Sequence, residues 1–143
     1  MGKLLFVLQL VLIAALLYFA DYEMLLSNPY LFVPLFLATI FGFYAYWSMK
    51  AEIYSLFPEP VENHKLVTVG AYRYTRHPMY AVYSLVGLIL MLSNFQLKTS
   101  VLFVLLLVVL ETTADIEEKL LAKKHPKYRE YQKITKKFIP FIY

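Results

Sequence analysis

The chain has 143 residues, of which 60% are hydrophobic and 17% aromatic, and its formal net charge is +4. A mean hydropathy of +0.57 is too high for an ordinary soluble domain, so the composition indicates a membrane protein and argues against nucleic acid as the partner of the basic residues. The absence of cysteine excludes disulfides and thiolate metal sites, and the three histidines are far apart in the sequence. We therefore expect no metal site.

Four apolar segments predict an all-α integral membrane protein with about four transmembrane helices. A helix rises about 1.5 Å per residue and the hydrocarbon layer is about 30 Å thick, so about 20 residues span it. Residues 4–20 and 30–47 come close to this length, residues 79–92 are shorter, and the fourth segment begins with residues 99–110. A cleaved signal peptide is the alternative for the first segment, but no small-x-small cleavage site follows it.

A polar connector, residues 48–75, separates the first two segments from the others. Its prolines, Pro58 and Pro60, rule out one continuous helix. We predict two parts: an N-terminal two-span hairpin over residues 1–57, and a catalytic region over residues 58–143 that ends in an amphipathic helical tail.

The placement of lysine and arginine predicts how the chain lies in the membrane. Four of these residues lie between the second and third segments and eight follow the fourth segment, whereas none lies between the first two segments and one lies between the last two. The positive-inside rule then places both termini and the connector in the cytoplasm. A small chain of this kind, without a targeting extension, is typical of a prokaryotic inner membrane.

The stretch from Leu66 to Tyr80 reads as an active-site loop, because it concentrates arginine, histidine and tyrosine between apolar segments. Pro78 stands where the third helix would begin. Proline is favoured at the first helical position and pushes the preceding residue toward an extended conformation. His77 would therefore lie at the N-cap of a membrane helix.

A second chemical signal is an acidic stripe at the end of the fourth segment. Glu111, Asp115 and Glu118 are spaced i, i+4 and i+7, so their carboxylates share one helical face. Acidic side chains that enter a membrane are usually functional, and Arg73, Arg76 or a cationic ligand could pair with them. The alternative is a helix that simply leaves the bilayer with its carboxylates solvated.

The tail after the acidic stripe alternates basic residues with apolar and aromatic ones, a pattern typical of a segment on anionic headgroups. His125 and Pro126 interrupt it, so we expect two short helices rather than one. Tyr128 and Tyr131 fit best as membrane-interface aromatics.

Several motifs together resemble those of integral-membrane methyltransferases of the isoprenylcysteine carboxyl methyltransferase and phospholipid methyltransferase group, from about Pro58 to the end. They are Leu-Val-Thr-Val-Gly-Ala-Tyr (66–72), Arg-His-Pro-Met-Tyr (76–80), Glu-Glu-Lys-Leu-Leu (117–121), Pro-Lys-Tyr-Arg-Glu-Tyr (126–131) and Phe-Ile-Pro (138–140). Val82 stands where that group often has glycine, which would change helix packing at the cofactor. Thr112, Thr113 and Asp115 stand where it often has a basic residue, which leaves the type of substrate open.

The resemblance implies methyl transfer from S-adenosyl-L-methionine to a lipophilic, membrane-resident acceptor, such as the carboxylate of a prenylcysteine-like molecule. It implies catalytic roles for Arg73, Arg76 and Glu118. The carboxylates could hold the ammonium group of the cofactor, arginine and histidine its carboxylate, and tyrosine faces its adenine or sulfonium. The implied cofactor site consists of Val67, Thr68, Gly70, Tyr72, His77, Pro78, Tyr80, Glu117 and Glu118.

Other functions stay open on the sequence alone. A carboxylate acceptor needs no base and could be oriented by Arg73 or Arg76, whereas the amine of a phospholipid must be neutral and would need Glu118 or His77 as a base. Some sterol reductases have a similar C-terminal region but bind a nicotinamide cofactor, and they have additional spans that this chain lacks. A non-enzymatic membrane scaffold would leave the acidic stripe unexplained.

Overall fold

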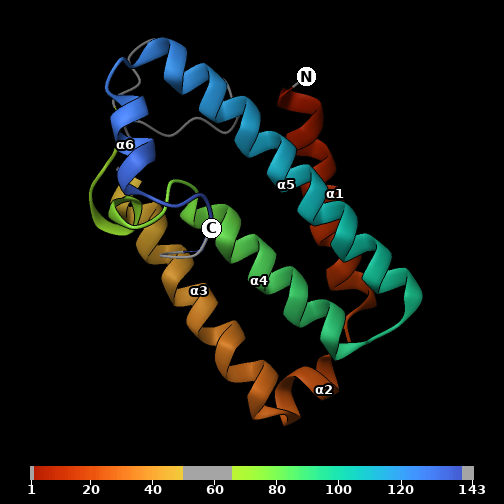
Figure 1. The fold of residues 1–143 in the computed structure, drawn as a ribbon. Coiled ribbons are helices and arrows are strands. Elements are labelled where there is room, and N and C mark those ends of the chain that lie inside the picture. Colours follow the sequence, from red (N-terminus) through yellow and green to blue (C-terminus); the bar gives the residue numbers. More distant parts are fainter. Residues whose placement is uncertain (1, 50–65, 140–143) are drawn as a thin grey trace.

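A computed structural model describes residues 2–49 and 66–139, and all of the regular structure in these ranges is helical. The elements are α1 (Gly2–Phe19), α2 (Tyr22–Ser27), α3 (Pro29–Met49), the 3₁₀ turn η2 (Gly70–Arg73), α4 (Pro78–Ser93), α5 (Leu97–Lys124) and α6 (Tyr128–Ile134) (Figure 1). Within these ranges three helices, α1, α3 and α5, are long and apolar enough to cross a membrane, and α4 is a shorter apolar helix. The prediction of an all-α integral membrane protein is confirmed.

The helices differ in length, and the difference matters for the site. With 28 residues, α5 is about 42 Å long and exceeds the hydrocarbon layer of about 30 Å, so its acidic end extends beyond that layer. With 16 residues, α4 is only about 24 Å long. Sequence analysis missed α2, a single short helix that Asp21 caps by accepting a hydrogen bond from the Met24 amide (2.9 Å).

Packing places α4 between α3 and α5, while α1 packs chiefly against α5 (Figure 1). The buried core contains Leu12 and Leu16 of α1, Leu90 of α4 and Leu106 of α5. Close approach of α4 and α5 depends on Gly87, where an added Cβ atom would lie 2.8 Å from Leu106 Cδ2. Many large apolar side chains of α1, α3 and α5 stay exposed, which suits contact with lipid.

Hydrogen bonds join the helix ends on the side where α4 turns into α5. The Asp21 amide donates to Ser93 Oγ (3.1 Å), and Asn94 Nδ2 donates to the Phe19 carbonyl (2.7 Å). Gln96 and Thr99 form a capping box at the start of α5. On the other side of the molecule, the opposite end of α5 contacts α6, and α3 contacts η2 (Figure 1).

The tail differs from the prediction in two ways. The interruption at His125 and Pro126 is where we expected it, but the segment before it continues α5 and is not a separate short helix. Tyr128 and Tyr131 are only 1% and 6% exposed, so the prediction that they lie at the membrane interface is wrong. They are buried because the tail folds back on the loop, where Tyr131 Oη donates to the Tyr72 carbonyl. The predicted domain boundary at residue 57 lies outside the described residues and stays a prediction.

Candidate active site

The loop before α4 is anchored on the end of α3. Gly70 has a φ of +63°, a left-handed conformation that disfavours residues with a Cβ atom, and an added Cβ would meet the Ser48 side chain. Ser48 Oγ also accepts a hydrogen bond from the Ala71 amide (3.4 Å). The glycine therefore lets η2 lie directly against α3, which fixes where the rest of the loop begins.

The second half of the loop pairs with the tail in a short parallel arrangement. The Arg76 amide donates to the Lys136 carbonyl (2.8 Å), and the His77 amide donates to the Lys137 carbonyl (3.0 Å). Thr75 is buried, and its hydroxyl donates to the Lys137 carbonyl (2.7 Å). These bonds bring residues about 60 positions apart in the sequence together at the start of α4.

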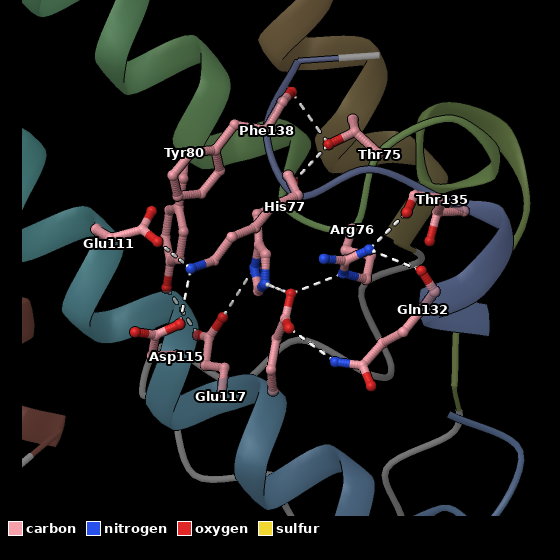
Figure 2. A network of polar contacts seen from close by, with 12 residues as sticks. Thr75, Arg76, His77, Tyr80, Glu111, Asp115, Glu117, Gln132, Thr135 and Phe138 are labelled. Carbon is pink, nitrogen blue, oxygen red and sulfur yellow. Dashed lines mark hydrogen bonds and ion pairs between the residues drawn. The ribbon is translucent and has the colours of Figure 1, made fainter. Parts of the chain in front are cut away.

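A buried ion pair joins the loop to α5. Arg76 Nε donates to Glu118 Oε1 (2.7 Å), and the two side chains are only 12% and 14% exposed (Figure 2). A second nitrogen of Arg76 reaches the tail, where Nη1 donates to the carbonyls of Thr135 (2.6 Å) and Gln132 (3.2 Å). Gln132 Nε2 donates to the other oxygen of Glu118 (2.7 Å). One guanidinium and one carboxylate thus connect three separate segments.

His77 lies between two carboxylates at the N-cap of α4, as the position of Pro78 predicts. Its Nε2 is 3.2 Å from Glu118 Oε1, and its Nδ1 is 3.3 Å from Glu117 Oε2 (Figure 2). Burial lowers the pKa of His77, but hydrogen bonds to Glu117 and Glu118 and their charges raise it more, so the pKa lies above the ordinary 6.5. The two carboxylates therefore stabilise the protonated imidazole.

Two aromatic rings pack against the histidine. The Tyr80 ring is stacked parallel to the His77 ring at 5.3 Å, and Tyr80 Oη donates to Glu117 Oε1 (2.7 Å). The Phe138 ring meets both of them edge-on, at 6.0 and 6.4 Å. These rings limit access of water to the ion pairs, which strengthens the electrostatic interactions inside the site.

The rest of the acidic stripe pairs with a lysine that sequence analysis did not single out. Lys137 Nζ contacts Glu111 Oε1 and lies 2.7 Å from Asp115 Oδ1 (Figure 2). Burial lowers the pKa of Lys137, but its bonds to the two carboxylates outweigh this and raise it above the ordinary value. The Lys137 side chain is 10% exposed, so this ion pair holds the tail against α5.

A cavity of about 1000 Å³ lies beside this network, between the loop and α6. The loop contributes Thr68, Gly70 and Arg73 to its lining, and the tail contributes Tyr131 and Thr135. The cavity adjoins the network through two of these residues, since Tyr131 binds the loop backbone and the Thr135 carbonyl accepts from Arg76.

Comparison with known proteins places the chain in a family. A profile of the Isoprenylcysteine carboxyl methyltransferase (ICMT) family matches residues 30–123, about two thirds of the chain. The chain belongs to the ICMT family. Members of the ICMT family use S-adenosyl-L-methionine to methylate the carboxyl group of prenylated substrates, so the chain is a membrane methyltransferase that uses this cofactor. No curated protein and no solved structure shows a significant match to the chain.

The residues that match the ICMT family are not the same as those that carry the resemblance in the sequence, which runs from about Pro58 to the end. The family match begins at residue 30 and so includes α3, where sequence analysis found no diagnostic residue. It ends at residue 123, before α6 and the segment that carries Lys137. The family match therefore does not include the part of the site that the tail forms, and only the structure of this chain describes that part.

The structure gathers most of the predicted site residues of this ICMT-family chain but separates one of them. Arg76, His77, Tyr80, Glu117 and Glu118 form one polar network. The other predicted residues lie along the loop: Val67 is half-buried, Thr68 and Gly70 line the cavity, and Tyr72 and Pro78 are buried.

Arg73 does not join the acidic stripe, contrary to one of our expectations, because it lies on the cavity side of the loop. Lys137 and Gln132 are the network residues that the sequence did not reveal. The stripe itself was a signal for Lys137, because it required a cation. No group of three or more metal-binding side chains occurs in residues 2–49 and 66–139.

Replacement of Gly70 with alanine tests the loop anchor. We expect Gly70→Ala to lower the stability by about 1–2 kcal/mol from the left-handed backbone alone, with an additional loss from contact with Ser48. Thermal unfolding in detergent measures the loss, and the double variant Gly70→Ala/Ser48→Gly should recover only the steric part. A Gly70→Ala protein as stable as the wild type would contradict this account of the loop.

The raised pKa of His77 predicts a pH-dependent stability. The folded state holds a proton that the unfolded state loses near the ordinary pKa of about 6.5, so the contribution of His77 is fully present below that pH. It is lost as the pH rises through the higher pKa of the folded state. Thermal unfolding should therefore show wild type to be more stable than His77→Gln, and this difference in stability should shrink as the pH rises above about 6.5. A difference that is constant or grows with pH would show that His77 is neutral.

Proposed function

We propose that this ICMT-family enzyme methylates the carboxylate of a prenylcysteine-like lipid at the cytoplasmic surface of the membrane. The observation that carries the proposal is the network around His77, where the start of α4 meets Glu117 and Glu118 of α5. The network lies at the mouth of the membrane helices and adjoins a cavity large enough for a small molecule. A polar site at the ends of the membrane helices is accessible both to a soluble cofactor and to the headgroup of a lipid.

The residues present fit S-adenosyl-L-methionine, which has a sulfonium, an ammonium, a carboxylate and an adenosine. Tyr128 Oη is buried without a hydrogen-bond partner among the described residues, so the tail carries a polar atom that the network does not satisfy. Glu130 lines the cavity and offers a negative charge for a cationic group of the cofactor. Each carboxylate oxygen accepts more than one hydrogen bond, so Glu117 has capacity for an ammonium in addition to Tyr80.

In this proposal, residues of the loop and of α5 hold the cofactor. Val67, Thr68 and Gly70 contribute backbone groups along the adenosine, and Tyr72, His77, Pro78 and Tyr80 form the wall toward α4. Glu117 and Glu118 provide negative charge for the cationic groups. Their position supports this, because both carboxylates face His77 rather than open solvent.

The mechanism requires alignment more than proton transfer. When bound, the cofactor supplies a methyl group that is activated by the positive charge of its sulfur. A carboxylate acceptor is already deprotonated near neutral pH, so no side chain has to act as a base. Arg73 orients the acceptor carboxylate, and Arg76 positions Glu118 and the tail through its bonds to both. The rings of Tyr80 and Phe138 exclude water from the reacting groups.

Calorimetric binding of S-adenosylhomocysteine to the protein in detergent tests the cofactor site. We expect micromolar binding by the wild type and at least about tenfold weaker binding by Glu118→Gln and His77→Ala, because each change removes a charged hydrogen-bond partner. Glu23→Gln is the matched control, since Glu23 lies in α2 on the other side of the molecule. Thermal unfolding confirms that each variant is folded.

Transfer of a labelled methyl group to an S-prenylated cysteine completes this test. Binding of a nicotinamide cofactor in place of S-adenosylhomocysteine would contradict the proposal and favour the reductase-like alternative. Transfer to the amine of a phospholipid, with none to the prenylated cysteine, would contradict the carboxylate acceptor.

We also propose that the protein lies in a prokaryotic cytoplasmic membrane with both termini in the cytoplasm. The natural chain has no cysteine, so single cysteines introduced at Lys3, Phe95 or Lys136 report their side of the membrane directly. Phe95 lies between α4 and α5 and is 72% exposed. A membrane-impermeant maleimide should label Phe95→Cys in intact spheroplasts, and Lys3→Cys and Lys136→Cys only after lysis. The reverse pattern would invert the orientation.

A further inference from the structure

The network around His77 is joined to the rest of the acidic stripe by one residue of the tail, Lys137. Its side chain reaches α5, where Nζ contacts Glu111 Oε1 and lies 2.7 Å from Asp115 Oδ1 (Figure 2). Its backbone carbonyl accepts hydrogen bonds from the loop, namely from the His77 amide (3.0 Å) and from the Thr75 hydroxyl (2.7 Å). One residue therefore connects α5 with the loop at the start of α4.

These contacts close a ring that begins and ends on α5. From Asp115 the ring passes along the Lys137 side chain to the Lys137 carbonyl, which accepts from the His77 amide. It returns from the His77 imidazole to Glu118 Oε1, 3.2 Å away. Asp115 and Glu118 are three positions apart on one helical face, or about 4.5 Å along the helix axis. His77 is thus held twice, by its side chain directly and by its backbone through Lys137, and both connections end on the same helix.

The next residue of the tail, Phe138, is fixed by the same contacts. Its ring meets the rings of His77 and Tyr80 edge-on, at 6.0 and 6.4 Å. Lys137 Nζ lies 5.6 Å from the centre of the Phe138 ring, and the Phe138 carbonyl accepts from the Thr75 hydroxyl (3.1 Å). A tail that moved away from α5 would therefore take this ring away from the stacked rings of His77 and Tyr80.

The depth of the ion pair in the membrane makes the contact between Lys137 and α5 persistent. The Lys137 side chain is only 10% exposed. Glu111 is 14 positions after Leu97, the first residue of α5, or about 21 Å along the helix, so it lies within a hydrocarbon layer about 30 Å thick. A carboxylate at that depth requires a cation, and Lys137 supplies it. The carboxylates consequently hold the ammonium, and with it the tail, in one place.

We propose that Lys137 is a positioning residue for methyl transfer: by connecting the tail to α5, it holds His77 and Phe138 in place. It acts through these two residues and not by contact with the reacting groups. The inference rests on the proposed role of the network around His77 in holding the cofactor. It adds a residue that lies beyond the part of the chain that matches the ICMT family, which ends at residue 123.

The loss of such a residue should affect the rate of the reaction more than the binding of the cofactor. Alignment of donor and acceptor is sensitive to small displacements, and a misplacement of about 1 Å lowers a rate by about a hundredfold. Binding of the cofactor is spread over many contacts with the loop and α5, so it tolerates such a shift better. A variant without the Lys137 ammonium should therefore differ from the wild type chiefly in kcat.

The variant Lys137→Met tests the proposal, because methionine keeps an unbranched apolar stem and removes the ammonium. In transfer of a labelled methyl group to an S-prenylated cysteine, we expect kcat to fall by about tenfold to a hundredfold. The Kd of S-adenosylhomocysteine, measured by calorimetry, should change by less than about threefold.

Two matched variants accompany this measurement. Lys137→Arg keeps the positive charge and should have a kcat within about threefold of the wild-type value. Lys133→Met removes the same charge from an exposed position at the end of α6 and should behave as the wild type.

A further variant separates positioning from a loss of folding. Without the ammonium, Glu111 and Asp115 lie four positions apart on one helical face and repel each other, so Lys137→Met also lowers the thermal stability. The triple variant Lys137→Met/Glu111→Gln/Asp115→Asn removes this repulsion and should recover the stability but not kcat. Recovery of kcat in the triple variant would show that Lys137 only neutralises the acidic stripe, and would overturn the proposal.

The position of the tail can also be measured without activity. Since the natural chain has no cysteine, Lys119→Cys on α5 and Ile139→Cys on the tail provide two sites for spin labels, and both residues are exposed. We expect one narrow distribution of distances between the labels in the wild-type background and with Lys137→Arg, and a broader one with Lys137→Met. An equally narrow distribution with Lys137→Met would contradict the proposal.

The possible failures are distinguishable. If the wild type methylates S-prenylated cysteine and Lys137→Met has the same kcat, or if Lys137→Arg is as slow as Lys137→Met, the inference is wrong and the proposed function stands. A Kd for S-adenosylhomocysteine that rises while kcat is unchanged would also overturn it, because Lys137 would then serve binding. If the wild type methylates no prenylated cysteine, the proposed function fails, and the spin-label distances decide whether Lys137 holds the tail.

Discussion

The structure of the site depends on one buried ion pair, between Arg76 of the loop and Glu118 of α5. Neither side chain is stable alone at this depth, because an unpaired charge with about one-eighth of its surface exposed costs several kcal/mol. Further hydrogen bonds connect the pair to its surroundings: Glu118 also contacts His77 and accepts from Gln132, and Arg76 also donates to two carbonyls of the tail. Loop, helix and tail are consequently fixed together.

The unequal lengths of α4 and α5 explain why this ion pair forms where it does. The two helices are antiparallel and joined by a short turn, and His77, just before the start of α4, lies beside Glu117 and Glu118 in the last third of the 28-residue α5. Because α4 is shorter than the hydrocarbon layer, its first residues reach the level where α5 carries Glu117 and Glu118. A longer α4 would have moved His77 away from both carboxylates.

Much of the fold was predictable from the sequence, because apolar runs, prolines and acidic spacing each report on local structure. Pro78 predicted the start of α4, and the spacing of Glu111, Asp115 and Glu118 predicted one shared face. What the sequence did not show was long-range pairing. Lys137 pairs with Glu111, which is 26 positions away in the sequence. Helical spacing shows which carboxylates need a cation, but it does not show which residue provides that cation. Tyr128 was misread for a related reason, since a buried tyrosine and an interfacial one look alike in composition.

The same arrangement gives α4 two faces of different chemistry. One face carries Tyr80 toward the carboxylates of α5, and an adjacent face carries Met79 and Leu90 along an apolar groove between α1, α3 and α4. Tyr83 lies between these faces, against the Tyr80 ring and in the groove. Since α4 is a rigid element, its rise per residue fixes the distance between the carboxylates and the far end of the groove.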